Sequence, residues 1–191
     1  MIRITLSTLT VFLLGITCAN AESFTPVERG TYSLDLDTTD GNFSQWALND
    51  LSGVNATRAK VTFARKGKHK TYAALATLSV EGKTRQVYIR FAALSDNGPL
   101  YSTVTLADSN GQIKEEVVLL PPDMKETFDL HVQWTPEGKV IFDLFDHANK
   151  DVGQGFERHE IEMGEPVTAL KIINSTGEVA IDPLQVGQAT P

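Results

Sequence analysis

Cysteine is almost absent from this chain. Cys18 is the only one in 191 residues, and it lies in a segment that we interpret below as a cleaved leader. The mature chain would then have no disulfide, no thiolate metal site and no cysteine nucleophile. An exported domain without disulfides depends on its hydrophobic core alone. About 170 residues suffice for this, because a domain of that size buries roughly 70% of its unfolded surface. We therefore expect one domain, residues 22–191.

The chain also lacks an apolar run long enough to cross a lipid bilayer. Residues 9–16 are apolar, follow Arg3, and precede an Ala-Asn-Ala sequence at residues 19–21, the form of a signal-peptidase site. This pattern predicts a secretory signal peptide over residues 1–21, and a mature protein that is periplasmic or secreted, with no membrane span. We expect it to be a monomer. Lipidation of Cys18 is the alternative, but a threonine precedes it where the lipobox usually has Gly, Ala or Ser.

An excess of positive charge is likewise missing. Lys and Arg number 17 and Asp and Glu 24, a formal net charge of −7, and we expect no nucleic-acid partner. The basic residues gather in one segment that contains a single acid, Glu81: Arg58, Lys60, Arg65, Lys66, Lys68, Lys70, Lys83, Arg85 and Arg90. This segregation predicts a basic patch on an acidic body. Solvated strands whose charges discourage pairing with other chains would produce the same pattern, and both interpretations stay open.

Amphipathic helices are not evident, whereas alternation is. Residues 127–146 read TFDLHVQWTPEGKVIFDLFD, with Phe128, Leu130, Val132 and Trp134 on one face of the first half. Period-two alternation is typical of a half-buried strand. The Thr-Pro-Glu-Gly sequence at residues 135–138 suits a tight reversal. We therefore predict a β-hairpin with Trp134 packed at its closed end.

Further strands are predicted along the rest of the chain, at residues 31–37, 56–63, 72–80, 85–93, 100–106, 112–120, 156–163, 167–174 and 178–186. Residues 42–49 suit a short strand or a helical turn. Roughly eleven to twelve short strands with regular turns predict an antiparallel sandwich or barrel. The core is predicted to contain Trp134, Phe128, Leu130, Val132, Phe142, Val87, Ile89 and Phe91.

The 127–146 hairpin, together with the closing sequence at residues 181–187, resembles the concanavalin A-like lectin/glucanase superfamily, including laminin-G-type domains. The resemblance implies an all-β fold, an antiparallel jelly-roll β-sandwich. Laminarinase-type glucanases of this fold use a Glu-x-Asp-x-Glu run on one strand, which this chain lacks. Its nearest carboxylate pairs, Asp35 with Asp37 and Glu160 with Glu162, alternate with apolar residues and are better explained as the solvated face of an edge strand.

Without a catalytic carboxylate set, the leading prediction is a secreted, non-catalytic carbohydrate-binding protein whose ligand is a polysaccharide or oligosaccharide, acidic if the basic segment contacts it. Sugar sites combine aromatic side chains with planar polar groups. Tyr72, Tyr88, Tyr101 and Trp46 are the available aromatics, and Tyr88 shares a strand face with Gln86 and Arg90. The predicted binding residues are Arg85, Gln86, Tyr88, Arg90, Tyr72 and His69. Alternatively, Tyr88 simply covers the sandwich.

Two other functions remain. A jelly-roll polysaccharide lyase would use a Tyr or His base beside an Arg, for which Tyr88, Arg90, Arg85 and His69 are of the right types; a glycoside hydrolase would use the 160/162 pair. A structural or protein-interaction domain of the cell envelope is the third function. No cofactor is expected. Residues 146–153 are oxygen-rich and loosely suggest calcium, but they lack EF-hand spacing and favour a turn. His131 and His159 are expected to be exposed.

Overall fold

The computed structural model describes residues 23–39, 42–65, 72, 74–95, 98–119, 126–146 and 157–190. These ranges contain eleven strands and no helix. The strands are β1 (Ser23–Thr38), β2 (Ser44–Leu48), β3 (Ala56–Arg65), β4 (Ala74–Glu81), β5 (Arg85–Ala93), β6 (Tyr101–Asp108), β7 (Ile113–Leu119), β8 (Thr127–Trp134), β9 (Lys139–Asp146), β10 (Glu157–Glu162) and β11 (Ala169–Thr190). Within the described ranges, no helix has the length and hydropathy needed to cross a bilayer.

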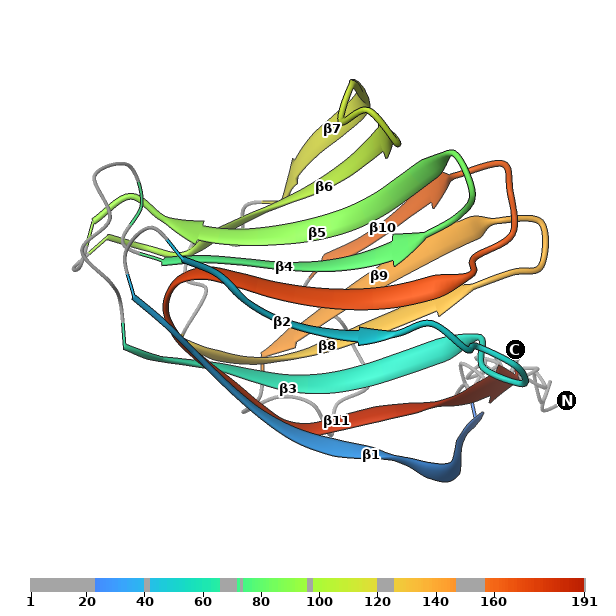
Figure 1. Ribbon diagram of the computed structural model, residues 1–191, viewed down its shortest axis with the longest axis horizontal. Helices are drawn as coiled ribbons and strands as arrows, with labels where there is room; N and C mark the ends of the chain where they lie inside the picture. Colours follow the sequence, from blue (N-terminus) through green and yellow to red (C-terminus); the bar gives the residue numbers. More distant parts are fainter. Residues whose placement is uncertain are drawn as a thin grey trace, which may run out of the picture.

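The strands form two antiparallel sheets that share β11. Sheet A runs β1, the C-terminal part of β11, β3, β8, β9 and β10. Sheet B runs β2, the N-terminal part of β11, β4, β5, β6 and β7. In Figure 1, β1 and the end of β11 run together along the lower edge of the molecule, while β5, β6 and β7 lie above them.

Strand β11 is continuous where the sequence pattern predicted two strands. Residues 169–176 pair with β4 in sheet B, and residues 178–187 pair with β3 in sheet A. Gly177, at the changeover, has a φ of 82°. Glycine adopts this conformation at little cost, so the chain changes sheets without leaving the hydrogen-bonded ladder. The predicted break after residue 174 is therefore wrong: the Ser-Thr-Gly sequence marks a bend inside one strand.

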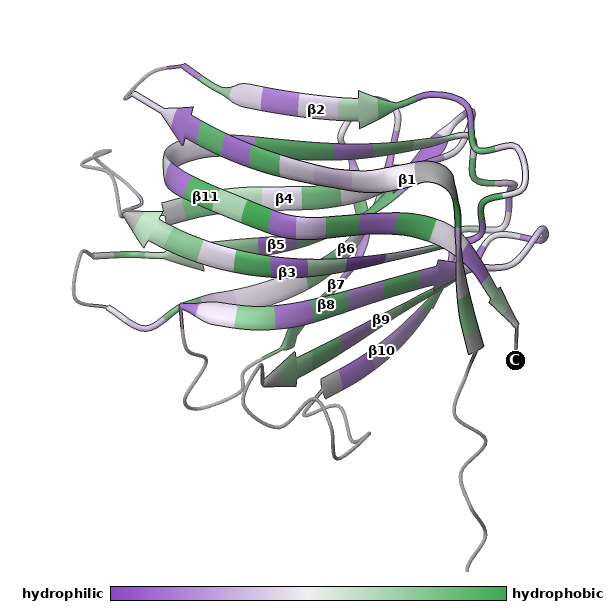
Figure 2. Ribbon diagram, turned by 90° about the horizontal axis from the view of Figure 1, so that it is seen from below, coloured by the Kyte–Doolittle hydropathy of each residue, from purple (hydrophilic) through white to green (hydrophobic). Residues whose placement is uncertain are grey.

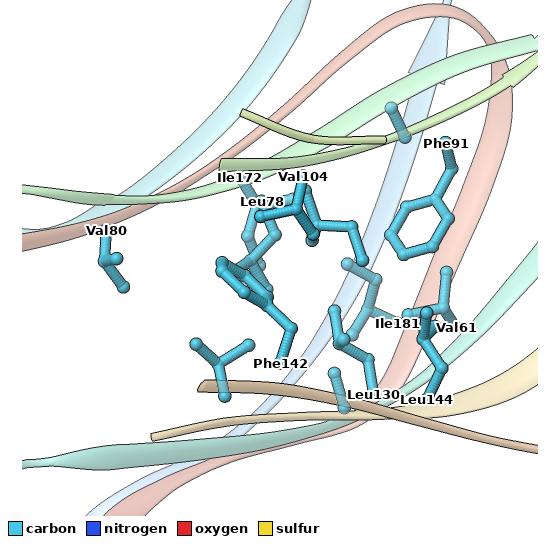
Figure 3. Close-up of a cluster of buried hydrophobic side chains, with 14 of the residues drawn as sticks. Val61, Leu78, Val80, Phe91, Val104, Leu130, Phe142, Leu144, Ile172 and Ile181 are labelled. Carbon is cyan, nitrogen blue, oxygen red and sulfur yellow. The ribbon is translucent and has the colours of Figure 1, made fainter. Parts of the chain in front are cut away.

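The core lies between the sheets, where the predicted alternation points it. Figure 2 shows hydrophobic and hydrophilic residues alternating along β3, β8 and β11. Side chains of the two sheets point toward one another in Figure 3, among them Leu78, Val104 and Ile172 of sheet B and Leu130, Phe142 and Leu144 of sheet A. All eight predicted core residues are buried, Trp134 among them at 6% exposed. The predicted hairpin is formed by β8 and β9, in which Val132 lies opposite Phe142 and Trp134 opposite Val140.

Of the two N-terminal strands, β2 resolves the choice between strand and helical turn that the sequence left open, and β1 is longer than predicted. Residues 44–48 form strand β2, and the ring centroid of Trp46 lies 5.0 Å from that of Tyr32 in an edge-to-face contact. Strand β1 begins at residue 23, well before the predicted residue 31, because it pairs along its length with the end of β11. Partners so distant in the chain leave no local pattern that predicts this pairing.

Candidate functional site

The face of sheet B that points away from the core carries an organised set of polar and aromatic side chains. On β5, Val87, Ile89 and Phe91 enter the core, so Tyr88 and Arg90 point to the outer face. The antiparallel register places Tyr88 opposite Thr105 of β6, and Arg90 opposite Thr103. Side chains paired in this way have Cβ atoms about 5 Å apart. Side chains of both β5 and β6 therefore form the centre of the outer face.

Five residues form what we call the tyrosine–arginine cluster: Tyr88, Arg90, Tyr101 and Thr103 of the outer face, and Tyr72, which lies near Tyr101. The Arg90 guanidinium carbon lies 5.2 Å from the centroid of the Tyr88 ring, and Nη2 donates a hydrogen bond of 3.3 Å to the Tyr88 hydroxyl. A guanidinium held over a ring is attracted by its negative face, which orients the planar fork. Tyr88 therefore fixes where the Arg90 donors point.

Tyr101 connects the remaining members electrostatically. Burial raises the pKa of Tyr101, the nearby Tyr72 raises it further, and the Arg90 guanidinium partly offsets both effects. The phenol therefore stays protonated at neutral pH and can donate as well as accept a hydrogen bond. Tyr72 and Tyr101 are half-buried, so both keep some ring surface exposed.

Small side chains at the centre of this face are buried although they point away from the core. Thr105 is fully buried, Ser79 is 4% exposed, and Thr103 and Tyr88 are each 8% exposed. Thr103 Oγ1 is buried and has no hydrogen-bond partner in the described part of the chain. A buried hydroxyl without a partner is uncommon, because leaving it unsatisfied costs free energy.

Carboxylates stand at the margins of this face and are already engaged. Glu81 forms an ion pair of 2.6 Å with Lys171, and Glu116 accepts a hydrogen bond of 3.1 Å from Thr105. These two are the only acids that the described strands place on the outer face of sheet B. Three strand spacings and a shift of two residues separate them by about 15 Å. Glycosidases need carboxyl groups about 5–9.5 Å apart, so the two cannot act together.

The structure brings two of the six predicted binding residues, Tyr88 and Arg90, into contact, and it places a third, Tyr72, near Tyr101. Gln86 lies on the same face one step along β5, opposite Glu81 and half-buried. Arg85 lies elsewhere, because its Nη1 donates a hydrogen bond of 2.8 Å to the carbonyl oxygen of Met163.

His69 lies outside the described residues. Trp46, the other aromatic considered, is on the core side of β2, where it packs against Tyr32. Thr103 was not predicted, although alternation along residues 100–106 places it on the outer face. What distinguishes Thr103 is its missing partner, which no sequence pattern encodes.

The basic segment does not form one patch. Arg58 and Lys60 lie on β3 in sheet A, opposite His131 and Asp129, whereas Arg90 lies on β5 in sheet B. Strands β3 and β5 are not neighbours, so the prediction that these cations share neighbouring strands is wrong. They are close in sequence because the chain passes from one sheet to the other between β3 and β4. Lys66, Lys68 and Lys70 lie outside the described residues.

The other candidate groups have ordinary surroundings. Glu160 and Glu162 are exposed on the terminal strand β10, where Lys139 and Arg158 hold the pKa of Glu160 below its usual value although burial opposes the shift. Asp35 and Asp37 are exposed on β1.

Both histidines were expected to be exposed, and both are half-buried. The His131 ring lies 4.5 Å from that of Phe145. His159 points from the end strand of sheet A toward the core side, because it pairs with Phe142. No group of three or more metal-ligating side chains occurs among the described residues. The calcium loop considered at residues 146–153 lies outside them, apart from the end of β9.

Comparison with known proteins supplies the fold. No protein-family model matches the chain, and no curated protein matches its sequence. Among solved structures, scytalido-glutamic peptidase with a transition state analog inhibitor is similar over 81% of this chain and 77% of its own, with a TM-score of 0.51 and 14% identity. A β-1,3-glucanase from Mycobacterium marinum (TM-score 0.49, 13% identity, 82% and 73% covered) and the Emp46p carbohydrate recognition domain (0.48, 10%, 87% and 85%) are also similar. Identities this low concern the fold alone. The predicted fold is confirmed: the chain is an all-β, antiparallel jelly-roll sandwich of the concanavalin A-like type.

Proposed function

We propose that this protein binds carbohydrate on the outer face of sheet B without cleaving it. The tyrosine–arginine cluster is the observation that carries the proposal. The half-buried Tyr101 lies on β6 near Arg90 and two residues from Thr103, and the half-buried Tyr72 lies near Tyr101. Sugar rings stack on aromatic side chains, and sugar hydroxyls bond to planar polar groups. The two carboxylates of this face each have another partner, Lys171 for Glu81 and Thr105 for Glu116, and they lie about 15 Å apart. This arrangement favours binding over hydrolysis.

Export is part of the proposal. The leader at residues 1–21 would direct the chain to the periplasm or the medium as a soluble monomer. Mass spectrometry of the mature N-terminus tests this. A chain that begins at Glu22 supports it, whereas a lipid-modified Cys18 would place the protein on a membrane.

Binding is tested with a panel of neutral and acidic glycans, in which both retention and the release of reducing or unsaturated ends are followed. Replacing Tyr101 with Ala should weaken the binding of a retained glycan by about tenfold, the loss expected for one stacking side chain. Phe145→Ala is the matched control, since it removes a half-buried ring from the outer face of sheet A. Equal effects of the two substitutions would argue against a site on sheet B. If the panel is neither retained nor cut, capture of protein partners becomes the next test, as an envelope interaction domain requires.

A polysaccharide lyase is the second candidate, and the contact between Arg90 and the Tyr88 hydroxyl favours it. In such a reaction a base removes the proton beside a uronate carboxylate, a cation stabilises the carboxylate, and the glycosidic oxygen departs as a double bond forms. Tyr88→Phe would abolish the release of unsaturated ends while leaving binding in place. Retention of uronate polymers without such ends decides for binding alone.

A further inference from the structure

Arg90 is a partly buried cation that has no acidic partner among the described residues, whereas several other cations of the two sheets are paired. Lys171 pairs with Glu81 at 2.6 Å, Arg158 with Asp143 at 3.3 Å, and Lys139 with Glu160. In the described ranges no carboxylate pairs with Arg90, although the chain has 24 acids and 17 bases. A guanidinium has five N–H donors, and the one hydrogen bond that Arg90 makes within these ranges goes to the Tyr88 hydroxyl. Most of its donors remain available.

The two acids that the described strands place on the outer face of sheet B have other partners. Glu116 on β7 accepts the hydrogen bond of Thr105, and Glu81 at the end of β4 is neutralised by Lys171. The residue paired with Arg90 on β4 is Thr77, and the one on β6 is Thr103. On both adjacent strands, the residue paired with Arg90 therefore carries a hydroxyl group and is not an acid.

Thr103 provides the second observation. Its side chain is 8% exposed, and its Oγ1 has no hydrogen-bond partner among the described residues. It stands directly opposite Arg90, with Cβ atoms about 5 Å apart. A buried hydroxyl and an oriented guanidinium thus belong to directly paired residues on the outer face.

We propose that this pair receives a carboxylate of the ligand, so that the protein recognises uronate-containing polysaccharides. The inference rests on the proposed function and names its ligand class. A carboxylate fits because its two oxygens match the parallel N–H groups of the Arg90 fork and retain capacity to accept the Thr103 hydroxyl. The cation–π contact with Tyr88 holds the fork in place before the ligand arrives. Recognition depends on this one contact, because the basic segment is divided between the two sheets.

The test compares each uronate polymer with its own methyl ester, which keeps the sugar backbone and removes the charge. Polygalacturonate, alginate and a glucuronate polymer are titrated in both forms by calorimetry. We expect one acid form to bind about 10- to 100-fold tighter than its ester, as for a charge-assisted hydrogen-bonded pair. Arg90→Gln should abolish the preference, Arg90→Lys should restore part of it, and Thr103→Val should reduce it several-fold. Lys60→Gln removes the same charge from the outer face of sheet A and should change nothing.

The possible outcomes separate this inference from the proposed function. Equal affinity for an acid and its ester would overturn the carboxylate inference, and so would a preference for the acid that survives Arg90→Gln. Carbohydrate binding would stand in both cases. Retention of poly-glutamate as tight as that of the best uronate polymer overturns the assignment to glycans. If no glycan is bound in either form, both proposals fail. Thermal melting checks that each variant folds, and Arg90→Lys and Thr103→Val decide the matter if Arg90→Gln does not.

Discussion

Asn174 connects the two sheets at the point where β11 passes from one to the other. The side chain is fully buried, and its Nδ2 donates to the carbonyl oxygens of Leu36 at 2.6 Å and Gly177 at 2.8 Å, and to Thr38 Oγ1 at 3.1 Å. Carbonyl oxygens only accept, so the nitrogen of the amide must face them. Thr38 Oγ1 in turn donates to the backbone carbonyl oxygen of Asn174 at 3.1 Å. The amide therefore ties the end of β1 to the bend in β11.

Asn174→Ala should lower the free energy of unfolding by about 2–3 kcal/mol, since the amide has two N–H groups, each buried hydrogen bond contributes roughly 1 kcal/mol net, and the substitution leaves buried acceptors without a donor. Asn174→Asp keeps the shape of the side chain but places a buried carboxylate against two carbonyl oxygens. Only the Thr38 hydroxyl could donate to such a charge, which is too little to compensate its desolvation, so the loss should be at least as large as for Ala at neutral pH. Desolvation raises the pKa of that aspartate above its unfolded value. The Asp variant should therefore recover stability as the pH falls through the raised pKa, because the protonated acid can donate one hydrogen bond.

Urea unfolding followed by tryptophan fluorescence measures these differences, with an unchanged slope as evidence that both end states are retained. Asn42→Ala is the control, because that exposed amide makes one hydrogen bond of 3.0 Å to Thr39 Oγ1 and should cost less than about 0.5 kcal/mol. If Asn174→Asp were milder than Asn174→Ala at neutral pH, shape and not hydrogen bonding would determine the contribution of this residue. The amide of Asn174 would then not be what ties β1 to β11.

Three further predictions concern the hairpin and its neighbours. Trp134→Ala should cost about 3–5 kcal/mol in urea unfolding, as for other buried aromatics, and a loss under about 1 kcal/mol would contradict its place in the core. Gly138 has a φ of 89°, and a Cβ there would overlap the Glu165 carbonyl oxygen, whereas Gly111 has a φ of 79° and open space. Gly138→Ala should therefore lower the free energy of unfolding clearly more than Gly111→Ala. Equal losses would refute the steric argument. Burial alone would raise the pKa of Glu165, but hydrogen bonds from the Thr84 backbone and hydroxyl and from the next backbone N–H hold it below its ordinary value of 4.5. Because the folded pKa is depressed, this stabilisation is present above the unfolded pKa and is lost as the pH falls through the folded one, and Glu165→Gln should show a smaller loss on acidification than the natural protein.

Local alternation was sufficient to predict most of the fold, because the side-chain period of a strand is set by its own backbone. Phe128, Leu130, Val132 and Trp134 were assigned to the core from that period alone, and all are buried. Pairing between distant strands could not be predicted in the same way. The division of β11 between two sheets depends on β1, β3 and β4 lying at its sides, and nothing within residues 169–190 specifies those partners.

For the candidate site too, the positions of side chains on one strand could be predicted, and the contacts between strands could not. Tyr88 and Arg90 could be placed on one face because they are two residues apart on one strand, and the structure puts them in contact. The sequence also suggested that nine cations act together, which failed because neighbours in the chain are separated once it crosses between sheets. Alternation could assign Thr103 to the outer face. Thr103 is significant because its hydroxyl has no hydrogen-bond partner among the described residues, and alternation does not predict that. Among the described residues, Thr103 has no hydrogen-bond partner and Arg90 has no acid beside it, and both facts depend on the neighbours of these two residues. Those neighbours come together only when β4, β5 and β6 pair. The carboxylate that we assign to this pair is therefore inferred from unfilled hydrogen-bonding capacity rather than from the kinds of residues present.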